Sequence, residues 1–241
     1  DDAIDRFRRS AELHRAGGRE VPALMTDVCV CQALAYGDRA DEARRQVPEL
    51  RDQAVRSGSA SAAAWAHYVT GEAIGDSDVP AALEAYDAAA EAARGIDHRL
   101  FLYLARSSSV ALVARSGSPA EALGQLDQLM TDWDEIGNVA AQVWMIRHVA
   151  LLLERLGHDD DAARLFGAAA ANSGRSFFLM GERQRVADAH QRISERRGES
   201  FLADGLAAGG RLTLDEALSA AQAGLARAQA EAVGDGVPVS R

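Results

Sequence analysis

Residues 139–172, VAAQVWMIRHVALLLERLGHDDDAARLFGAAAAN, contain the pattern that decides the fold. The first half predicts a helix over 139–156, because apolar side chains cover most of its circumference and leave only a narrow polar stripe. Gly157 breaks this helix, and the alanine-rich stretch that follows predicts a second helix over 159–172. Two helices cannot bury such an apolar helix alone, so the pattern indicates neighbouring hairpins that cover it.

The same hairpin recurs along the chain about every 40 residues, which is the signature of a helical repeat. One series of alanines has spacings of 39, 40 and 40 residues: Ala43, Ala82, Ala122 and Ala162. A second series, from the other helix of each unit, has spacings of 41, 39 and 40 residues: Leu24, Trp65, Leu104 and Trp144. Because apolar residues return at a fixed interval, each unit is expected to stack on the next.

The repeat places the expected helices. First helices of the units are predicted over 21–36, 60–75, 98–116, 139–156 and 176–197. Second helices are predicted over 3–16, 39–57, 80–94, 119–136, 159–172 and 199–208. The expected N-caps of four second helices are Asp38, Asp78, Ser118 and Asp159. A last helix is predicted over 213–230, because Thr213 and Glu216 have the spacing of a capping box.

These helices predict an all-α fold, a right-handed α-solenoid of tetratricopeptide-like hairpins with about 11 or 12 helices. One domain is expected over 1–232, followed by a disordered tail over 233–241. Its units are expected near 3–16, 21–57, 60–94, 98–136, 139–172 and 176–208, with 213–230 as the capping helix. The chain opens on a second helix, so we expect the array to be part of a longer one.

The composition argues against several classes of function. The formal net charge of −10 argues against a surface that binds nucleic acid directly. All 26 basic residues are arginine, so the sequence offers no Schiff-base lysine and no P-loop lysine. No signal peptide and no apolar stretch of about 18 residues is visible, so we expect no membrane contact and a cytoplasmic location.

The chemistry-bearing residues point to no catalytic, cofactor or metal site. None of the six histidines has metal-ligand spacing. Cys29 and Cys31 would point to opposite sides of a helix and are expected to be small core residues. The run Asp159 to Asp161 is expected to complement a helix dipole. The arginine-rich stretch 183–197 predicts a solvated face or, alternatively, a docking surface for an acidic partner.

A binding groove is the most specific site that the repeat suggests. First helices of stacked hairpins usually line a concave surface, and polar residues follow three positions after the apolar series. The candidate groove residues are Asp27, Trp65, Tyr68, Ser107, Trp144, Arg147 and His148. Two alternatives remain open: both tryptophans lie buried between hairpins, and the serines 107–109 serve only close helix packing.

Two segments near the end resemble one protein family. Residues 161–171, DAARLFGAAAA, resemble a stretch of the large actinobacterial ATP-binding transcriptional regulators of the LuxR and SARP types. Residues 197–218, RGESFLADGLAAGGRLTLDEAL, resemble the ending of the same proteins, except that Asp204-Gly205 replaces Ala-Trp and Gly209-Gly210 adds a glycine. The resemblance implies a tetratricopeptide-like region, with the ATPase and any DNA-binding domain outside this chain.

Taken with that resemblance, the repeat predicts a non-catalytic sensor or protein-interaction domain of a transcriptional or signalling regulator. Its expected partner is a protein or peptide, including the regulator's own ATPase domain, or a small effector. The alternative is an architectural segment that spaces domains or forms a homodimer. An enzyme on this scaffold would need a deep pocket in which His148, Arg147 and a carboxylate converge.

Overall fold

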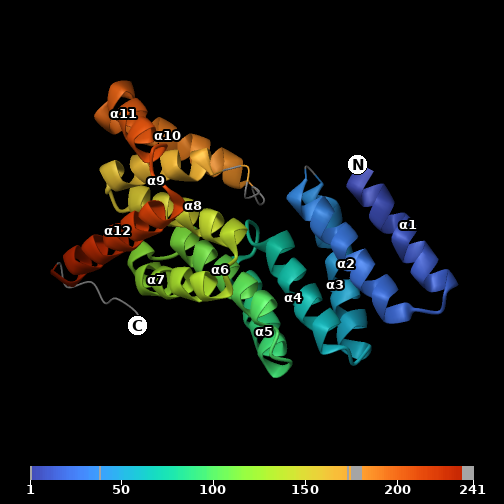
Figure 1. Ribbon diagram of the computed structural model, residues 1–241. Coiled ribbons are helices and arrows are strands. Elements are labelled where there is room, and N and C mark those ends of the chain that lie inside the picture. Colours follow the sequence, from blue (N-terminus) through green and yellow to red (C-terminus); the bar gives the residue numbers. More distant parts are fainter. Residues whose placement is uncertain (1, 38, 173, 175–180, 235–241) are drawn as a thin grey trace. The chain divides into compact units, whose positions relative to one another are not determined.

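The computed structural model describes residues 2–37, 39–172, 174 and 181–234, and these residues form twelve α-helices and no β-strand (Figure 1). The first six are α1 (Asp2–Ala16), α2 (Glu20–Tyr36), α3 (Ala40–Arg56), α4 (Ala60–Ile74), α5 (Val79–Gly95) and α6 (Arg99–Ser116). The other six are α7 (Pro119–Ile136), α8 (Val139–Arg155), α9 (Asp159–Ala171), α10 (Glu182–Arg197), α11 (Glu199–Gly209) and α12 (Leu214–Gly234). The predicted all-α fold of repeated helical hairpins is confirmed.

The residues of the alanine series form part of the core, as a stacked repeat requires, whereas Trp65 and Leu104 of the second series are only partly buried. All four alanines of the first series are 0 % exposed: Ala43, Ala82, Ala122 and Ala162. Four residues after each alanine, one further turn of helix, lie side chains that are at most 3 % exposed: Val47, Tyr86, Leu126 and Phe166. The small alanine lets adjacent helices approach, and the larger residue fills the space beside it.

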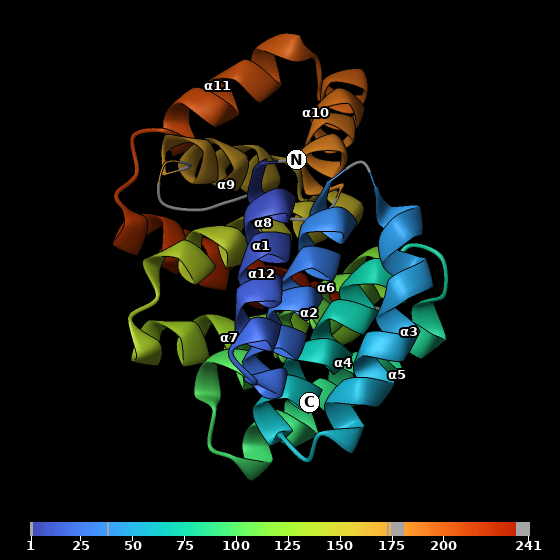
Figure 2. The ribbon, with the colours of Figure 1, turned by 90° about the vertical axis from the view of Figure 1, so that its right-hand side faces the viewer.

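The helices form two compact units, Asp1–Leu112 and Val113–Arg241, and the boundary falls within α6. In unit 1, α2 packs against α1, α3 and α4, and α4 packs closely against α5. In unit 2, α8 packs against α7 and α9, and Figure 2 shows the hairpin of α10 and α11 beside α9. No helix among the described residues is both long enough and apolar enough to cross a bilayer.

The contacts of α11 and α12 in unit 2 go beyond the sequence prediction. The final helix was expected to cap the end of the array, but α12 runs back against α7, α8 and α9 (Figure 1). Its contact face is made of small residues and one leucine, all at most 3 % exposed: Ala217, Ala221, Leu225 and Ala228. The helix α11 lies so close to α9 that a Cβ added at Gly209 would sit 1.7 Å from the carbonyl oxygen of Arg164. Gly209 therefore serves a close backbone contact between α11 and α9.

The predicted helix caps are confirmed in part. Asp78 caps α5 as predicted, because its side chain accepts the Ala81 N–H at 3.1 Å. The Thr213–Glu216 capping box is confirmed, with reciprocal bonds of 2.8 and 3.3 Å. Ser118 holds the N-cap position of α7, but its side chain makes no capping bond. The N-cap prediction for Asp159 is wrong: His158 is the N-cap of α9, and Asp159 lies buried inside the first turn.

Three other predictions touch residues outside the described part of the chain. Asp38, the predicted cap of α3, is one of them. The helix predicted over 176–197 begins at Glu182 in the structure, and residues 176–180 lie outside the described range. The predicted tail began at Val233, but α12 continues to Gly234. Residues 235–241 of that tail lie outside the described range.

Candidate functional site

A run of stacked rings, here called the aromatic cluster, lies on α4, α6 and the turn between α5 and α6. Its members are Trp65, Tyr68, His98 and Phe101. The Trp65 ring stacks on Tyr68 at 5.2 Å and on Phe101 at 4.9 Å, and His98 stacks on Phe101 at 4.0 Å. Tyr68 is buried, whereas the other three rings are partly exposed. The cluster therefore presents rigid ring surface to solvent above a buried base.

Local sequence explains how the rings come together. Trp65 and Tyr68 are three residues apart on α4, so they share one face of that helix. His98 precedes α6, and its Nδ1 accepts the Phe101 N–H at 3.4 Å, which holds the imidazole at the start of the helix. Offset stacking is favourable for such rings beyond the area that they bury. Tertiary packing of α4 against its neighbours then brings the Trp65 and Phe101 rings together.

Beneath the cluster, phenolic hydroxyls form a buried polar network. The Tyr36 and Tyr68 hydroxyls lie 3.1 Å apart, and Gln32 donates to the Tyr36 oxygen at 3.1 Å. Tyr86 donates to Glu72 at 2.8 Å. Burial, and after it the charge of Glu72, raises the pKa of both Tyr36 and Tyr68, so both hydroxyls keep their protons. A satisfied buried network of this kind makes the base of the cluster rigid.

The predicted groove residues do not share one open surface. Trp65 is partly exposed in the aromatic cluster, but Tyr68 and Ser107 are 3 % and 0 % exposed. Asp27 is partly exposed and forms an ion pair with Arg15, at a groove between α1 and α3. Of the residues that lie three positions after the apolar series in unit 1, Tyr68 and Ser107 are polar side chains buried between helices. The four candidates of unit 1 therefore line no common groove, because Tyr68 and Ser107 are buried and the groove at Asp27 does not include Trp65.

In unit 2, the remaining three candidates lie together but buried. Trp144, Arg147 and His148 are 2 %, 3 % and 8 % exposed, so the alternative of a buried tryptophan holds for Trp144. Arg147 Nε donates to Glu182 Oε1 at 2.9 Å, and His148 packs edge-on against Trp144 at 4.9 Å. Glu182, on α10, was not singled out in the sequence, because its partner lies 35 residues away.

The electrostatics of this buried group suit packing rather than proton transfer. Burial lowers the pKa of His148 far below its ordinary value, and the positive charges of Arg185, Arg147 and Arg115 lower it further. His148 Nε2 lies 3.9 Å from Glu182 Oε1. A histidine, an arginine and a carboxylate do converge here, as an enzyme would need. A substrate would reach them only by displacing the side chains that cover them, since all three are nearly fully buried.

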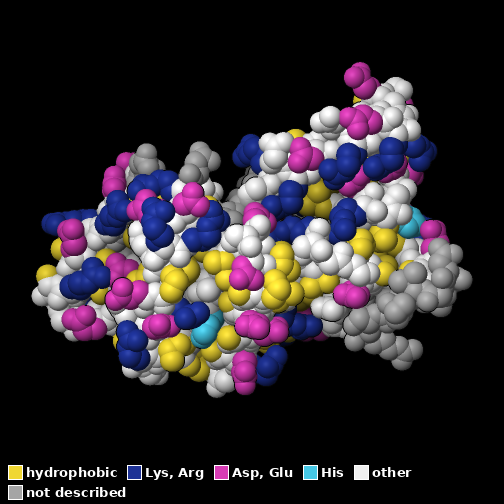
Figure 3. All heavy atoms as spheres, turned by 180° about the vertical axis from the view of Figure 1, so that it is seen from behind, with side chains coloured by type: hydrophobic (Ala, Val, Ile, Leu, Met, Phe, Trp, Pro, Cys, Tyr) yellow, Lys and Arg dark blue, Asp and Glu magenta, His cyan; other side chains and the backbone are white. Residues whose placement is uncertain are grey.

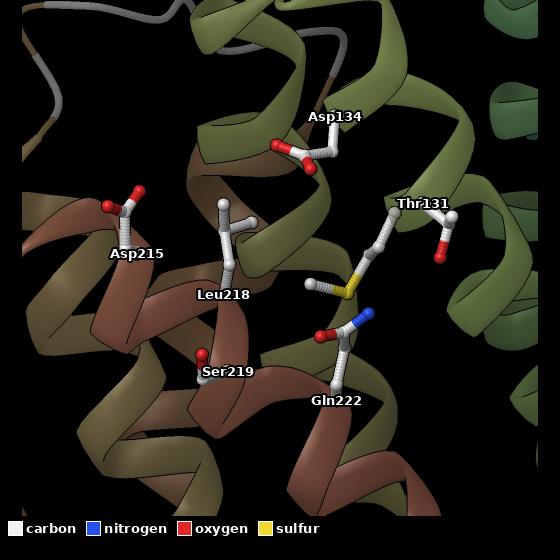
Figure 4. Close-up of a pocket in the computed structure, with 7 residues that line it drawn as sticks. Thr131, Asp134, Asp215, Leu218, Ser219 and Gln222 are labelled. Atoms are coloured by element: carbon white, nitrogen blue, oxygen red, sulfur yellow. The ribbon is translucent and has the colours of Figure 1, made fainter.

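Unit 2 also has a small cavity of about 280 Å³ between α7 and α12. Figure 4 shows Asp134 and Asp215 on either side of Leu218, with the Gln222 amide and the Ser219 hydroxyl along α12. Asp134 already accepts a hydrogen bond from Gln142 at 2.9 Å. Paired carboxylates favour cationic groups, but both aspartates lie at exposed positions, where water competes with any ligand.

The described residues offer no metal site, and the face drawn in Figure 3 carries charges of both signs. Within the described residues, no three His, Cys, Asp or Glu side chains are placed to hold a metal ion. Figure 3 shows arginines and carboxylates interspersed on the face that it presents, with hydrophobic side chains between them. A surface of mixed charge lacks the broad positive field that attracts a nucleic-acid backbone.

No protein-family model, curated protein or solved structure matches the chain.

Proposed function

We propose that the chain is a non-catalytic interaction domain of a transcriptional or signalling regulator and that the aromatic cluster binds a peptide segment of a partner protein. The partly exposed stack of Trp65, Phe101 and His98 is the observation that carries the proposal. The repeat fold supports it, because stacked hairpins commonly present their first helices to partners. The resemblance of residues 161–171 and 197–218 supports the regulator context.

Aromatic rings suit this role for a physical reason. A ring buries a large area at low entropic cost, since only two side-chain torsions become fixed. Phe, Trp and Tyr together make up 5 % of the sequence, so the stacked and partly exposed pair of Trp65 and Phe101, with His98 beside it, is a local concentration of rings. Trp and Tyr are also enriched among the residues that dominate binding energy at interfaces. The expected partner is an extended segment with an apolar side chain that lies against Trp65 and Phe101.

Selection from a displayed peptide library on the whole chain tests the proposal. Selected peptides should bind Trp65→Ala at least about tenfold more weakly, as loss of an interface anchor predicts. Trp65→Phe should keep part of the affinity because it keeps a stacked ring. The matched control is Val55→Ala, which removes an apolar side chain of unit 1 that is 53 % exposed outside the cluster. Equal binding by Trp65→Ala and Val55→Ala would reject the aromatic cluster as the binding surface.

A further inference from the structure

Phe101 lies between two stacked rings of the aromatic cluster. Its ring is nearly parallel to both neighbours, with interplanar angles of 25° to Trp65 and 6° to His98. Rings whose centroids lie 4.9 and 4.0 Å from Phe101 would overlap each other on one side of it, so Trp65 and His98 cover opposite faces of Phe101. Only the edges of the Phe101 ring therefore remain open to a partner.

His98 differs from Phe101, because a ring stacks on only one of its faces. Among the described residues, no second ring is stacked on His98, and its side chain is partly exposed. Ile96 and Leu100, two residues before and after it, are 40 and 39 % exposed. An open ring face thus lies next to exposed aliphatic side chains at the turn between α5 and α6.

The turn holds this ring in place. Asp97 has a φ of 53° and so redirects the chain at the end of α5. The His98 N–H then donates to the Ala93 carbonyl oxygen at 2.9 Å, as in a Schellman motif. The His98 carbonyl accepts the Leu102 N–H at 3.1 Å, which makes His98 the N-cap of α6, and its Nδ1 accepts the Phe101 N–H. Backbone and imidazole are both fixed before a partner binds, so little freedom is lost on binding.

Capping alone does not require an imidazole at this position. Ser59, Asp78 and Asn138 cap other helices through short side chains without a ring, and these residue types are the preferred N-caps. His98 adds a planar face to the cap. Because Nδ1 accepts the capping bond, the neutral ring carries its proton on Nε2, which has no acceptor among the described residues.

We infer that the partner segment places an aromatic side chain on the outer face of His98, in addition to the apolar side chain at Trp65 and Phe101. This second anchor rests on the proposed function, since it belongs to the same partner. A phenyl, phenol or indole ring extends the stack by one ring, in the offset arrangement that aromatic pairs prefer. Ile96 and Leu100 contact its rim, and the Nε2–H donates to a carbonyl oxygen of the segment. An aliphatic side chain has no planar face to fill this position.

Two small probes test the ring position directly on the whole chain. N-acetylphenylalaninamide and N-acetylcyclohexylalaninamide have nearly the same size, but only the first has an aromatic ring. In NMR titrations at millimolar concentration, the phenylalanine probe should move the ring-proton resonances of His98 through its ring current, and the cyclohexyl probe should not. Resonances that stay in place, or that move equally with both probes, would overturn the ring position whatever peptide selection gives.

Peptide selection then tests whether a partner segment uses this position. Displayed peptides whose binding depends on Trp65 should share an aromatic residue at one position. Cyclohexylalanine at that position should weaken binding about fivefold, which corresponds to the loss of one aromatic pair. Peptides that depend on Trp65 but share no aromatic residue would overturn the second anchor and leave the proposed function intact. Peptides that bind independently of Trp65 would reject the proposed function, and the phenylalanine probe then decides the ring position alone.

Two substitutions separate the ring of His98 from its cap. His98→Asn removes the ring but keeps a preferred capping acceptor, so it should weaken the selected peptides about fivefold while α6 stays capped. His98→Phe keeps a ring and removes the acceptor, so it should keep the affinity and lower the melting temperature. His158→Asn, the same change at the N-cap of α9, is the matched control and should leave the affinity unchanged. Equal affinities for His98→Asn and His158→Asn would overturn the role of the His98 ring.

Discussion

The Arg147 guanidinium and the Glu182 carboxylate form a two-pronged pair, with bonds of 2.9 and 3.4 Å, inside unit 2. Both side chains are at most 3 % exposed, and they join α8 to the first turn of α10. Ala189 and Ile193 are the buried apolar side chains of α10. The attachment of α10 to α8 therefore combines a buried ion pair with a small apolar contact.

Removal of this buried carboxylate should destabilise the chain strongly. Glu182→Gln leaves the Arg147 charge buried without its counter-charge, which costs about 3–5 kcal/mol in comparable cases. Urea unfolding followed by circular dichroism measures the loss. Glu12→Gln is the matched control, since Glu12 pairs with Arg9 at an exposed position and should matter by less than about 1 kcal/mol. Similar losses in the two variants would mean that burial of the pair contributes nothing.

A second carboxylate should make the attachment of α10 sensitive to acid. Glu154 accepts hydrogen bonds from Arg192 at 2.7 Å and from Arg196 at 2.8 Å, and Arg196 also bonds to Asp159 at 2.6 Å. Burial acts to raise the pKa of Glu154, but the bonds from both arginines outweigh it and hold that pKa below its ordinary 4.5. A lowered carboxyl pKa contributes stability above the unfolded-state value, and this contribution is lost as the pH falls through the folded-state value.

Glu154→Gln should therefore be less stable than the wild type at pH 7, by about 2 kcal/mol for lost charge-assisted bonds. The difference should shrink as the pH falls below 4.5 and the wild-type carboxyl takes up its proton. Urea unfolding across this range measures it. Glu199→Gln, at an exposed position of α11, is the control and should match the wild type throughout. A difference that stays constant with pH would contradict the role of the Glu154 charge.

The buried imidazole of His148 should produce a separate pH dependence nearer neutrality. Its folded-state pKa lies well below 6.5, because burial and three arginines disfavour the charged ring. As the pH falls below 6.5, the His148 imidazole binds a proton in the unfolded state but stays neutral in the folded state, so the free energy of unfolding decreases. The slope from this one group reaches at most about 1.4 kcal/mol per pH unit.

His148→Phe should flatten this slope between pH 6.5 and pH 5 while keeping an aromatic ring against Trp144. Urea unfolding at several pH values gives both slopes directly. A slope equal to that of the wild type would mean that His148 accepts its proton inside the fold.

The contact between α9 and α11 should tolerate no side chain at Gly209. An added Cβ would meet backbone atoms of Arg164, which cannot rotate away as a side chain can. Gly209→Ala should therefore cost about 2 kcal/mol or more, even though alanine favours helix. Gly95→Ala is the control, since nothing lies within 4 Å of its added Cβ, and it should be neutral or slightly stabilising. The melting temperatures of the two variants test this prediction. Equal melting temperatures would show that α11 can move away from α9 to make room for the added methyl group.

The helices could be predicted because their signals are local. Breaks such as Gly157 and caps such as Asp78 are recognised by neighbours a few residues away, and helix ends fell close to the predicted positions. The candidate site was predicted less well. All three of Trp65, Ser107 and Trp144 were candidate groove residues, but only Trp65 is partly exposed. The other two are buried, because a position in a helical period does not say which neighbour covers it. Glu182 carried no local signal at all.

The arginine-rich stretch 183–197 shows the same limit. Its sequence fitted a solvated face or a docking surface for an acidic partner. In the structure, Arg192 and Arg196 pair with Glu154 and Asp159, so the acidic partner lies within the same chain. A solvated arginine and an arginine in an ion pair look identical in sequence, because the difference depends on a carboxylate about 40 residues away.

The sequence alone determined that helical hairpins repeat every 40 residues and that alanines such as Ala43 and Ala162 lie in their core. Only the tertiary structure decided that α12 returns to α7, that Glu154 and Glu182 form ion pairs between α8 and α10, and that arginines and carboxylates together line the groove between α1 and α3. The physical reason is the distance along the chain over which each kind of interaction acts. Helix formation and apolar periodicity are set within a few turns, whereas the choice of partner depends on shape and charge meeting across segments that the sequence keeps apart.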